Sequence, residues 1–285
     1  MKKIAIASGK GGTGKTFLTT NLYNILQGEG RRVAVVDCDA EVPNASLFLK
    51  GDKLQEWPTI AFCPQIEVEK CTFCSLCATH CHFHAITCIP VAHYIKVLPD
   101  LCHACEGCLQ DCASDAIHVH WKATGSITAY GQGDKVQLIE ARLKEGEHSP
   151  VDLIREAIAK GEEMDLDYLL LDAPPGCSCP FVNTVMDADY VILVSEPTPF
   201  GLSDLKHTVD VLHTLKKPFS VVINRADLGN SQMKEYLAEN QIPLLAEIPY
   251  SENIAKMYSK GTLAVNQDQS LKQILANIAQ HVTTT

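Results

Sequence analysis

The stretch Gly9-Lys10-Gly11-Gly12-Thr13-Gly14-Lys15-Thr16 decides the fold, because it fits the phosphate-loop pattern G-x-x-x-x-G-K-[ST]. That pattern is specific only when a strand precedes it and a helix follows it, and both are predicted here. An apolar run over residues 3–7 predicts a short buried strand, and apolar residues at helical spacing over 16–27 predict a helix that ends at two glycines. A β-branched run over 33–36 predicts the next strand.

Each part of the loop has a chemical role that suits its residue type. Glycines let backbone N–H groups converge on phosphate oxygens, and the positive end of the helix dipole adds to that attraction. We expect Lys15 to reach the β- and γ-phosphates and the Thr16 hydroxyl to ligate Mg²⁺. The predicted nucleotide contacts from the loop and the start of its helix are Gly11, Gly12, Thr13, Gly14, Lys15, Thr16 and Phe17.

A lysine directly after the first glycine gives the form K-G-G-x-G-K-T. In this the chain resembles the deviant-Walker ATPases of the MinD/Mrp and nitrogenase iron-protein type, within the SIMIBI class of P-loop ATPases. The resemblance implies ATP hydrolysis by a nucleotide-sandwich homodimer, in which Lys10 reaches the phosphates bound by the partner subunit. The alternative for Lys10 alone is a solvated loop lysine.

Two further segments carry the same resemblance. Val36-Asp37-Cys38-Asp39 is similar to the first switch region of the class, which implies that Asp39 orients or deprotonates the attacking water and Asp37 lies near Mg²⁺. The segment LLLDAPPG over 169–176 is similar to its Walker B strand and second switch. The implied catalytic set is Lys10, Lys15, Asp39 and Asp172, and the implied magnesium set is Thr16, Asp37 and Asp172.

Two segments near the end of the chain are candidates for contact with the base of the nucleotide. Asn224 and Arg225 follow a predicted strand at 219–223, where proteins of this class contact adenine, and Pro249 with Tyr250 resembles the second edge of that pocket. Asparagine is also a common turn residue after a strand, so a structural role for Asn224 stays open.

Strands and helices alternate again from Pro150 to the end of the chain, which predicts an α/β fold with a doubly wound, mostly parallel sheet. Residues 60–120 interrupt this alternation after the second strand, and they contain two cysteine runs, over 71–81 and 102–112, with the spacing of bacterial ferredoxins. We therefore predict a discontinuous ATPase domain over 1–59 and 121–285, with a small α+β ferredoxin-like domain inserted over 60–120. The glycine-containing segment 121–150 is expected to be irregular.

Eight of the thirteen cysteines fall in two runs of the form C-x2-C-x2-C-x3-C. Bacterial ferredoxins use this spacing for [4Fe–4S] clusters, and the fourth cysteine of each run ligates the other cluster. We therefore predict two clusters per chain, one held by Cys71, Cys74, Cys77 and Cys112 and the other by Cys102, Cys105, Cys108 and Cys81. Structural zinc is the alternative. The proline that usually follows the fourth cysteine is absent, which weakens the argument slightly without removing a ligand.

Cys177 and Cys179 lie in the segment that resembles the second switch. Two thiols cannot complete the ligation of a [4Fe–4S] cluster, but two copies across a two-fold axis supply four. We predict a third cluster, or another metal, shared across the dimer, with a redox-active dithiol and a pair of buried cysteines as the alternatives. His80, His82 and His84 are interpreted as surface residues near a cluster that tune its potential, not as ligands.

The net charge of −10 argues against nucleic acid as a partner. The apolar run after Met1 is too short for a signal peptide, so a cytoplasmic location is expected. An apolar stripe runs along the last helix, from Leu271 to Val282, but Lys272 is the only lysine or arginine on its polar face. We interpret this helix as packed on the sheet, with no stable membrane association.

The combined pattern predicts an ATP-hydrolysing iron–sulfur protein that couples ATP turnover to low-potential electron transfer toward an unidentified redox partner. An iron–sulfur or metallocofactor carrier resembling Mrp, which would deliver its cargo to an apo-protein, is the alternative. A spatial regulator resembling MinD is a weaker third possibility, because the last helix is poorly suited to membrane binding.

Overall fold

The computed structural model describes residues 1–147 and 149–284, which divide into two compact units. Unit 1 comprises Met1–Glu56, Ile127–Arg142 and the chain from Val151 onward. Unit 2 comprises Trp57–Ser126 and Leu143–Pro150, and it contains the whole of the segment 60–120.

The described residues form a nine-stranded sheet with the order β11-β10-β9-β1-β8-β2-β7-β6-β3. The strands are β1 (Lys2–Ala7), β2 (Val33–Asp37), β3 (Asp52–Ile66), β6 (Ile117–Gln132), β7 (Lys135–Leu143), β8 (Tyr168–Asp172), β9 (Tyr190–Ser195), β10 (Phe219–Asn224) and β11 (Leu244–Ile248). Every neighbouring pair from β11 to β7 runs parallel. The predicted α/β fold with a mostly parallel sheet is therefore confirmed.

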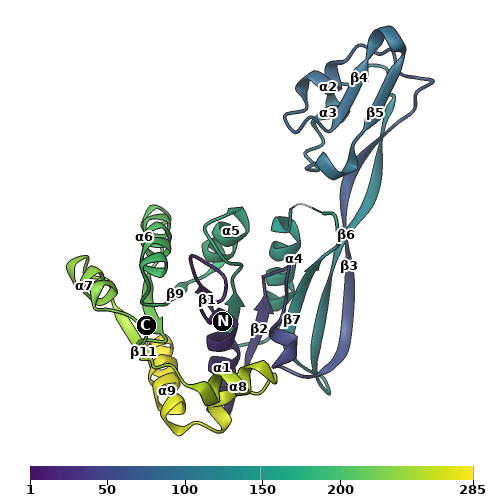
Figure 1. Cartoon of the computed structure of the whole chain (residues 1–285). Helices are drawn as coiled ribbons and strands as arrows, with labels where there is room; N and C mark the ends of the chain where they lie inside the picture. Colours follow the sequence, from purple (N-terminus) through teal and green to yellow (C-terminus); the bar gives the residue numbers. More distant parts are fainter. Residues whose placement is uncertain (148, 285) are drawn as a thin grey trace. The chain divides into compact units, whose positions relative to one another are not determined.

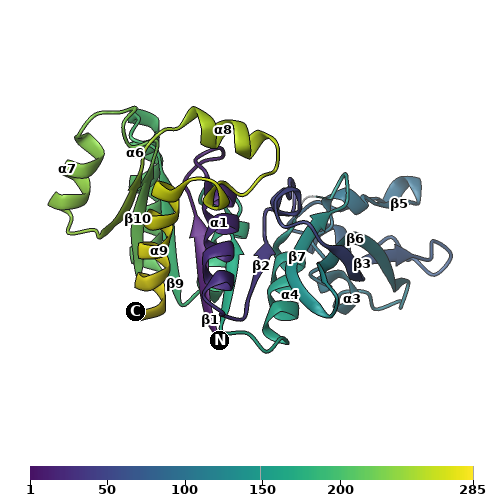
Figure 2. The same ribbon diagram turned by 90° about the horizontal axis from the view of Figure 1, so that it is seen from below.

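Helices cover both faces of this sheet, with α1 and α9 on one face and α4, α5 and α6 on the other (Figures 1 and 2). The helices of unit 1 are α1 (Lys15–Gly28), α4 (Val151–Glu162), α5 (Cys179–Asp187), α6 (Pro199–Thr214), α7 (Gln232–Glu239), α8 (Glu252–Ser259) and α9 (Gln269–Thr284). From β1 the chain crosses α1 toward β2, whereas from β8 it crosses α5 toward β9. The direction of winding thus reverses beside β1, and ligands of such sheets bind at the carboxyl ends of the strands at this point.

The last helix packs on the body of unit 1, as the sequence predicted. Leu271, Leu275, Ile278 and Val282 are buried in the main core cluster, where α9 contacts α1 and β11. Within the described ranges, no helix is both long enough and apolar enough to cross a membrane.

The expectation of irregular structure over 121–150 was wrong, because β6 and β7 occupy most of this segment. Ile127, Ala129, Leu138 and Ile139 from these strands are buried. Gly131 lies in β6, where the backbone of β7 comes very close. A Cβ at position 131 would lie 2.0 Å from the Lys135 carbonyl oxygen, so this position requires glycine.

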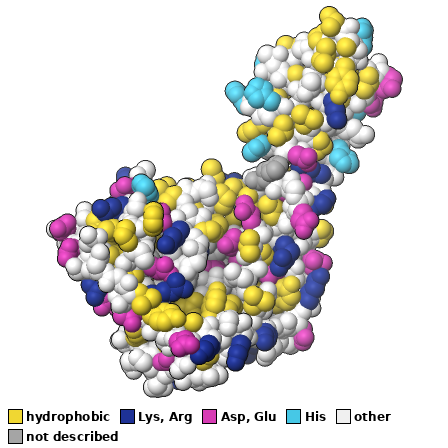
Figure 3. Space-filling view, in the orientation of Figure 1, with side chains coloured by type: hydrophobic (Ala, Val, Ile, Leu, Met, Phe, Trp, Pro, Cys, Tyr) yellow, Lys and Arg dark blue, Asp and Glu magenta, His cyan; other side chains and the backbone are white. Residues whose placement is uncertain are grey.

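Unit 2 holds a small antiparallel sheet of β4 (Ile86–Ile89) and β5 (Tyr94–Val97), with the short helices α2 (Leu76–His80) and α3 (Gly107–Gln110). One buried apolar cluster of this unit is Cys77, Ile86 and Ile117, with partly buried residues packed against it, and few further apolar side chains of its described residues, such as Phe62 and Ala116, are buried. Figure 3 shows histidine side chains on its surface. So small a core indicates that the unit needs another source of stability.

Candidate nucleotide site and cysteine cavities

The phosphate loop lies between the end of β1 and the start of α1, and its shape depends on glycine. Gly14 has a φ of +103°, and a Cβ there would lie 2.5 Å from Asn224 Nδ2. Asn224 Nδ2 donates a hydrogen bond to the Thr13 carbonyl oxygen at 2.8 Å, so the end of β10 holds the loop in place. A side chain at position 14 would therefore break both the backbone geometry and this contact.

Two buried carboxylates face the start of α1 from the ends of adjacent strands. The sheet register pairs Asp172 of β8 with Asp37 of β2. Thr16 Oγ1 donates to Asp172 Oδ2 at 2.6 Å, and Thr19 Oγ1 donates to Asp172 Oδ1 at 3.1 Å. Asp37 accepts backbone N–H groups from Asp39 at 3.1 Å and from residues 44 and 45 at 2.9 Å each, which fixes the segment after β2.

Burial sets the electrostatics of this cluster. It raises the pKa of Asp172 to about 6, against the opposing effect of hydrogen bonds from Thr16 and Thr19 and of the Lys15 charge. Burial, followed by the Asp172 charge, raises the pKa of Asp37 well above its ordinary value. Burial also lowers the pKa of Lys15, although three carboxylates oppose that shift. Desolvated carboxylates in such proximity favour a bound cation, and their hard oxygen donors suit Mg²⁺.

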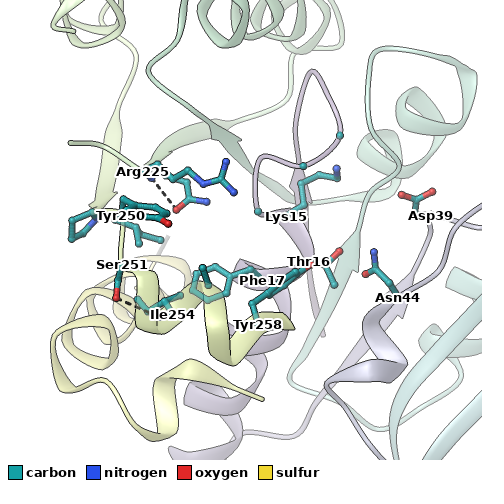
Figure 4. A pocket seen from close by; sticks show the side chains of 17 residues that line it. Lys15, Thr16, Phe17, Asp39, Asn44, Arg225, Tyr250, Ser251, Ile254 and Tyr258 are labelled. Atoms are coloured by element: carbon teal, nitrogen blue, oxygen red, sulfur yellow. Dashed lines mark hydrogen bonds between the residues drawn. The ribbon is translucent and has the colours of Figure 1, made fainter. Parts of the chain in front are cut away.

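A cavity of about 420 Å³ opens beside the loop. Its lining includes Gly11, Gly12, Gly14, Lys15, Thr16, Phe17, Asp39, Asn44, Asn224, Arg225, Ile248, Pro249, Tyr250, Ser251, Ile254, Ala255 and Tyr258. Figure 4 shows Lys15, Asp39 and Asn44 at one end and Tyr250 with Arg225 at the other. The loop end thus carries the charged groups Lys15 and Asp39, while α8 contributes Ile254, Ala255 and Tyr258, a combination that suits the phosphates and the base of a nucleotide.

Two buried polar atoms close to the phosphate loop have no hydrogen-bond partner within the described residues. Six side-chain polar atoms of the described residues are buried without a hydrogen bond, and Thr13 Oγ1 and Asn44 Oδ1 are the two at the phosphate loop and the segment facing it. Buried polar groups are nearly always paired, and Asn44 lines the cavity, where its oxygen can contact a ligand. The oxygen donors of Thr16 and Asp172 fit Mg²⁺, and the open loop fits phosphate.

Lys10 is not among the described residues that line the cavity. Its Nζ lies 3.8 Å from Glu196 Oε2, and Arg225 Nη1 lies 2.6 Å from Glu196 Oε1. The Glu196 side chain is only 11% exposed. Sequence reasoning missed this carboxylate, although its place directly after β9, next to the strand that carries the loop, could have identified it.

Thr19 and Tyr258 were also missed. Thr19 lies one helical turn after Lys15, on the same face of α1, so helical spacing could have identified its contact with Asp172. Tyr258 is placed by α8, and its ring packs against Phe48 with 4.7 Å between centroids. The sequence of α8 by itself gave no sign that Tyr258 would line the nucleotide cavity.

The eight cysteines of the paired runs line two small cavities in unit 2. Cys71, Cys74, Cys77 and Cys112 line the first cysteine cavity. Cys81, Cys102, Cys105 and Cys108 line the second cysteine cavity. The grouping is the one predicted from the spacing, with the fourth cysteine of each run crossing to the other cavity.

In each cysteine cavity the four thiols belong to the lining and are not gathered around one point. Within the described ranges, no group of three His, Cys, Asp or Glu side chains could hold a single metal ion. Four thiols line each cavity, which is the number of cysteine ligands that a [4Fe–4S] cluster takes. Backbone N–H groups donate to sulfur at Cys71, Cys81 and Cys112 over 3.3–3.4 Å, a contact that suits a thiolate ligand. The donor set therefore fits a [4Fe–4S] cluster in each cavity.

Cys177 and Cys179 are both exposed, at the start of α5. The Gly176 N–H donates to the Ser8 carbonyl oxygen at 3.0 Å, which ties this segment to the phosphate loop. Cys177 Sγ lies 3.4 Å from Thr208 Oγ1. Both thiols are therefore accessible to another molecule, and they directly follow Gly176, which contacts the segment before the phosphate loop.

A phosphate loop after β1, carboxylates at the ends of neighbouring strands and a parallel sheet define a P-loop NTPase. The chain belongs to the family described as the CobQ/CobB/MinD/ParA nucleotide binding domain, which it matches over residues 4–265.

Relatives and solved structures agree with this placement. An uncharacterized protein of Methanocaldococcus jannaschii is 30% identical over 268 residues, covering 92% of this chain and 90% of that protein. An iron-sulfur cluster carrier protein of the same organism is 25% identical over 300 residues, covering 98% and 84%. The cell division ATPase MinD of Pyrococcus furiosus has a similar fold, with a TM-score of 0.59 and 20% identity over 99% of this chain and 98% of that one.

Proposed function

We propose that this protein is an ATP-hydrolysing iron–sulfur protein, acting as a nucleotide-sandwich homodimer that couples ATP turnover to low-potential electron transfer. The observation that carries the proposal is the division of the eight cysteines into two cavities of four, in a chain whose other unit is a MinD/ParA-type ATPase. A nucleotide switch and a pair of electron carriers are thereby joined in one polypeptide.

The nucleotide would lie with its phosphates on Gly11–Thr16 and its base against Asn224, Arg225 and Pro249. Lys15 is desolvated beside the loop, where its charge acts strongly on the β- and γ-phosphates. Asp39 lies at the phosphate end, where it orients the attacking water. Thr16 and Asp172, with Asp37 beside them, would hold Mg²⁺, which when bound neutralises charge on the transferred phosphoryl group.

A dimer is supported by the position of Lys10. Its side chain is one-third exposed and contacts Glu196, and Lys10 is not among the described residues that line the cavity. In the proposed dimer Lys10 leaves this contact and reaches the phosphates of the partner subunit. Glu196 remains paired with Arg225, so the buried carboxylate keeps a counter-charge during the exchange.

Iron–sulfur carriage is the second candidate function. It is favoured by the exposed pair Cys177 and Cys179, which follows Asp172 and contacts the loop through Gly176. A cluster shared between two such pairs would be accessible to an acceptor and would respond to nucleotide state. A MinD-like spatial role is less supported, because the apolar stripe of α9 is buried.

The two functions are separated by what leaves the protein. Anaerobically loaded protein is incubated with ATP and an apo-protein acceptor, and iron and reducing equivalents are measured on the acceptor. If the protein transfers electrons, the acceptor is reduced but gains no iron. If it carries clusters, the acceptor gains iron and sulfide.

The shared cluster has its own test. A bridging cluster adds two irons to the eight of the cysteine cavities, so about ten Fe per chain are expected, falling to about eight in Cys177→Ser/Cys179→Ser. About eight Fe in both proteins would exclude a bridging cluster.

A further inference from the structure

The two cysteine cavities are related by an internal repeat of 31 positions. Each cysteine of the first run has its counterpart 31 positions later, from Cys71 and Cys102 to Cys81 and Cys112. The backbone follows the same repeat, since Phe73 and Ala104 both adopt positive φ, at 57° and 56°. Differences between equivalent positions therefore report differences between the two cavities, and not differences in chain geometry.

Hydroxyl-bearing residues border the first cysteine cavity, alongside the apolar residues Ile66, Ile95 and Ile117. Thr72 and Ser114 both border it. Ser114 Oγ lies 3.6 Å from Cys112 Sγ, and the Ala116 N–H donates to the same sulfur at 3.3 Å. A second backbone N–H, that of Phe73, donates to Cys71 Sγ at 3.4 Å. The sulfurs of this cavity thus have backbone donors and, at Cys112, a hydroxyl that donates when the sulfur is a thiolate.

Aromatic rings stand at the equivalent positions of the second cysteine cavity. Phe83 replaces Ser114 and His103 replaces Thr72 in the repeat, and both line this cavity. Their rings stack with centroids 3.9 Å apart and an angle of 14° between planes.

The polar contacts of the second cavity differ in kind, and one of them joins the Cys102 and Cys63 side chains. Cys81 Sγ accepts the Ala85 N–H at 3.3 Å, the equivalent of the Ala116 contact. In the part of the chain that the structure describes, no hydroxyl is bonded to a sulfur of this cavity. Cys102 Sγ instead lies 4.0 Å from the Phe62 carbonyl oxygen, whose partial negative charge disfavours added electrons.

We propose that the two cavities hold [4Fe–4S] clusters of unequal reduction potential, with the cluster of the first cysteine cavity the more easily reduced. One-electron reduction adds a negative charge to a cluster. Hydrogen-bond donors to sulfur stabilise that charge, whereas stacked rings exclude water from it. An electron shared by the pair therefore settles on the first cluster. The inference rests on the proposed presence of clusters in unit 2.

The test uses the repeat as its own control. Anaerobically reconstituted full-length protein is titrated with dithionite and mediators, and the reduced clusters are followed by electron paramagnetic resonance. Ser114→Ala removes the hydroxyl from the first cavity and should lower the potential of the more easily reduced cluster alone. Phe83→Ser places a hydroxyl at the equivalent position of the second cavity and should raise the lower potential, narrowing the gap. Thr79→Ala, in an exposed part of α2, should move neither.

Iron and sulfide are counted in every variant, so that loss of a cluster is not mistaken for a shifted potential. If Ser114→Ala loses iron, Phe83→Ser still tests the inference from the other cavity. If both cysteine cavities hold iron and show one common reduction step that neither Ser114→Ala nor Phe83→Ser moves, the two potentials are equal and the inference is overturned, although the clusters themselves remain supported. A reconstituted protein without iron or sulfide would overturn the proposed function itself.

Discussion

The Lys10 ammonium lies 3.8 Å from the Glu196 carboxylate of its own chain. The contact draws the lysine toward the end of β9, while Arg225 shares the same carboxylate. A lysine that serves its own cavity would line that cavity, as Lys15 does. The proposed action of Lys10 on a partner subunit requires it to leave this contact.

Substitution of the two loop lysines should therefore have different effects. Lys15→Ala should abolish nucleotide binding, because it removes the charge at the phosphates. Lys10→Ala should bind ATP as a monomer but lose ATP-dependent dimerisation, with hydrolysis reduced about 100-fold or more. Fluorescent-nucleotide binding and light scattering measure the two effects, and Lys272→Ala serves as a control. Normal ATP-dependent dimers of Lys10→Ala would contradict the trans role.

Gly14→Ala should prevent nucleotide binding without unfolding unit 1. The added Cβ meets Asn224 Nδ2 at 2.5 Å, and a non-glycine residue at a φ of +103° adds strain of about 1–3 kcal/mol. At least a tenfold loss of affinity is expected. Gly28→Ala, at the end of α1, has open space around its Cβ and should bind normally. Equal affinities for the two variants would show that the loop does not contact the nucleotide.

Removal of iron should unfold unit 2 selectively. Its buried apolar cluster holds Cys77, Ile86 and Ile117 among the described residues, whereas unit 1 has an extensive core. Metal sites of small domains supply folding free energy directly. After chelation, amide exchange should accelerate in β4 and β5 while β1 and β8 stay protected. Unchanged protection of β4 and β5 would mean that unit 2 folds without clusters.

A carboxylate at the opposite end of the sheet gives a pH-dependent prediction. Hydrogen bonds from Arg32 lower the pKa of Asp167 to about 2, below its unfolded value of about 3.9. A lowered folded pKa contributes stability above the unfolded pKa, and this stability is lost as the pH falls toward 2. Asp167→Asn should therefore lower the melting temperature most at pH 5–7. A difference that stays constant down to pH 3 would contradict the assignment.

Features encoded over a few consecutive residues could be predicted from the sequence. The phosphate loop and the cysteine runs are of this kind, because their spacing fixes which groups meet. Contacts between distant segments could not be predicted, such as those of Glu196 with Lys10 and of Tyr258 with Phe48. The strands β6 and β7 were missed because Gly131 and Gly133 suggested a loop, whereas a close approach of chains requires glycine at position 131.

Coupling between the nucleotide site and the clusters is the central claim, and it is tested most directly by one comparison. ATP hydrolysis is measured anaerobically on protein with a full complement of iron, once with oxidised clusters and once after reduction with dithionite. The account predicts different rates in the two states, with the difference lost when Cys71 and Cys102 are both replaced by serine. Equal rates in the oxidised and reduced states would contradict it.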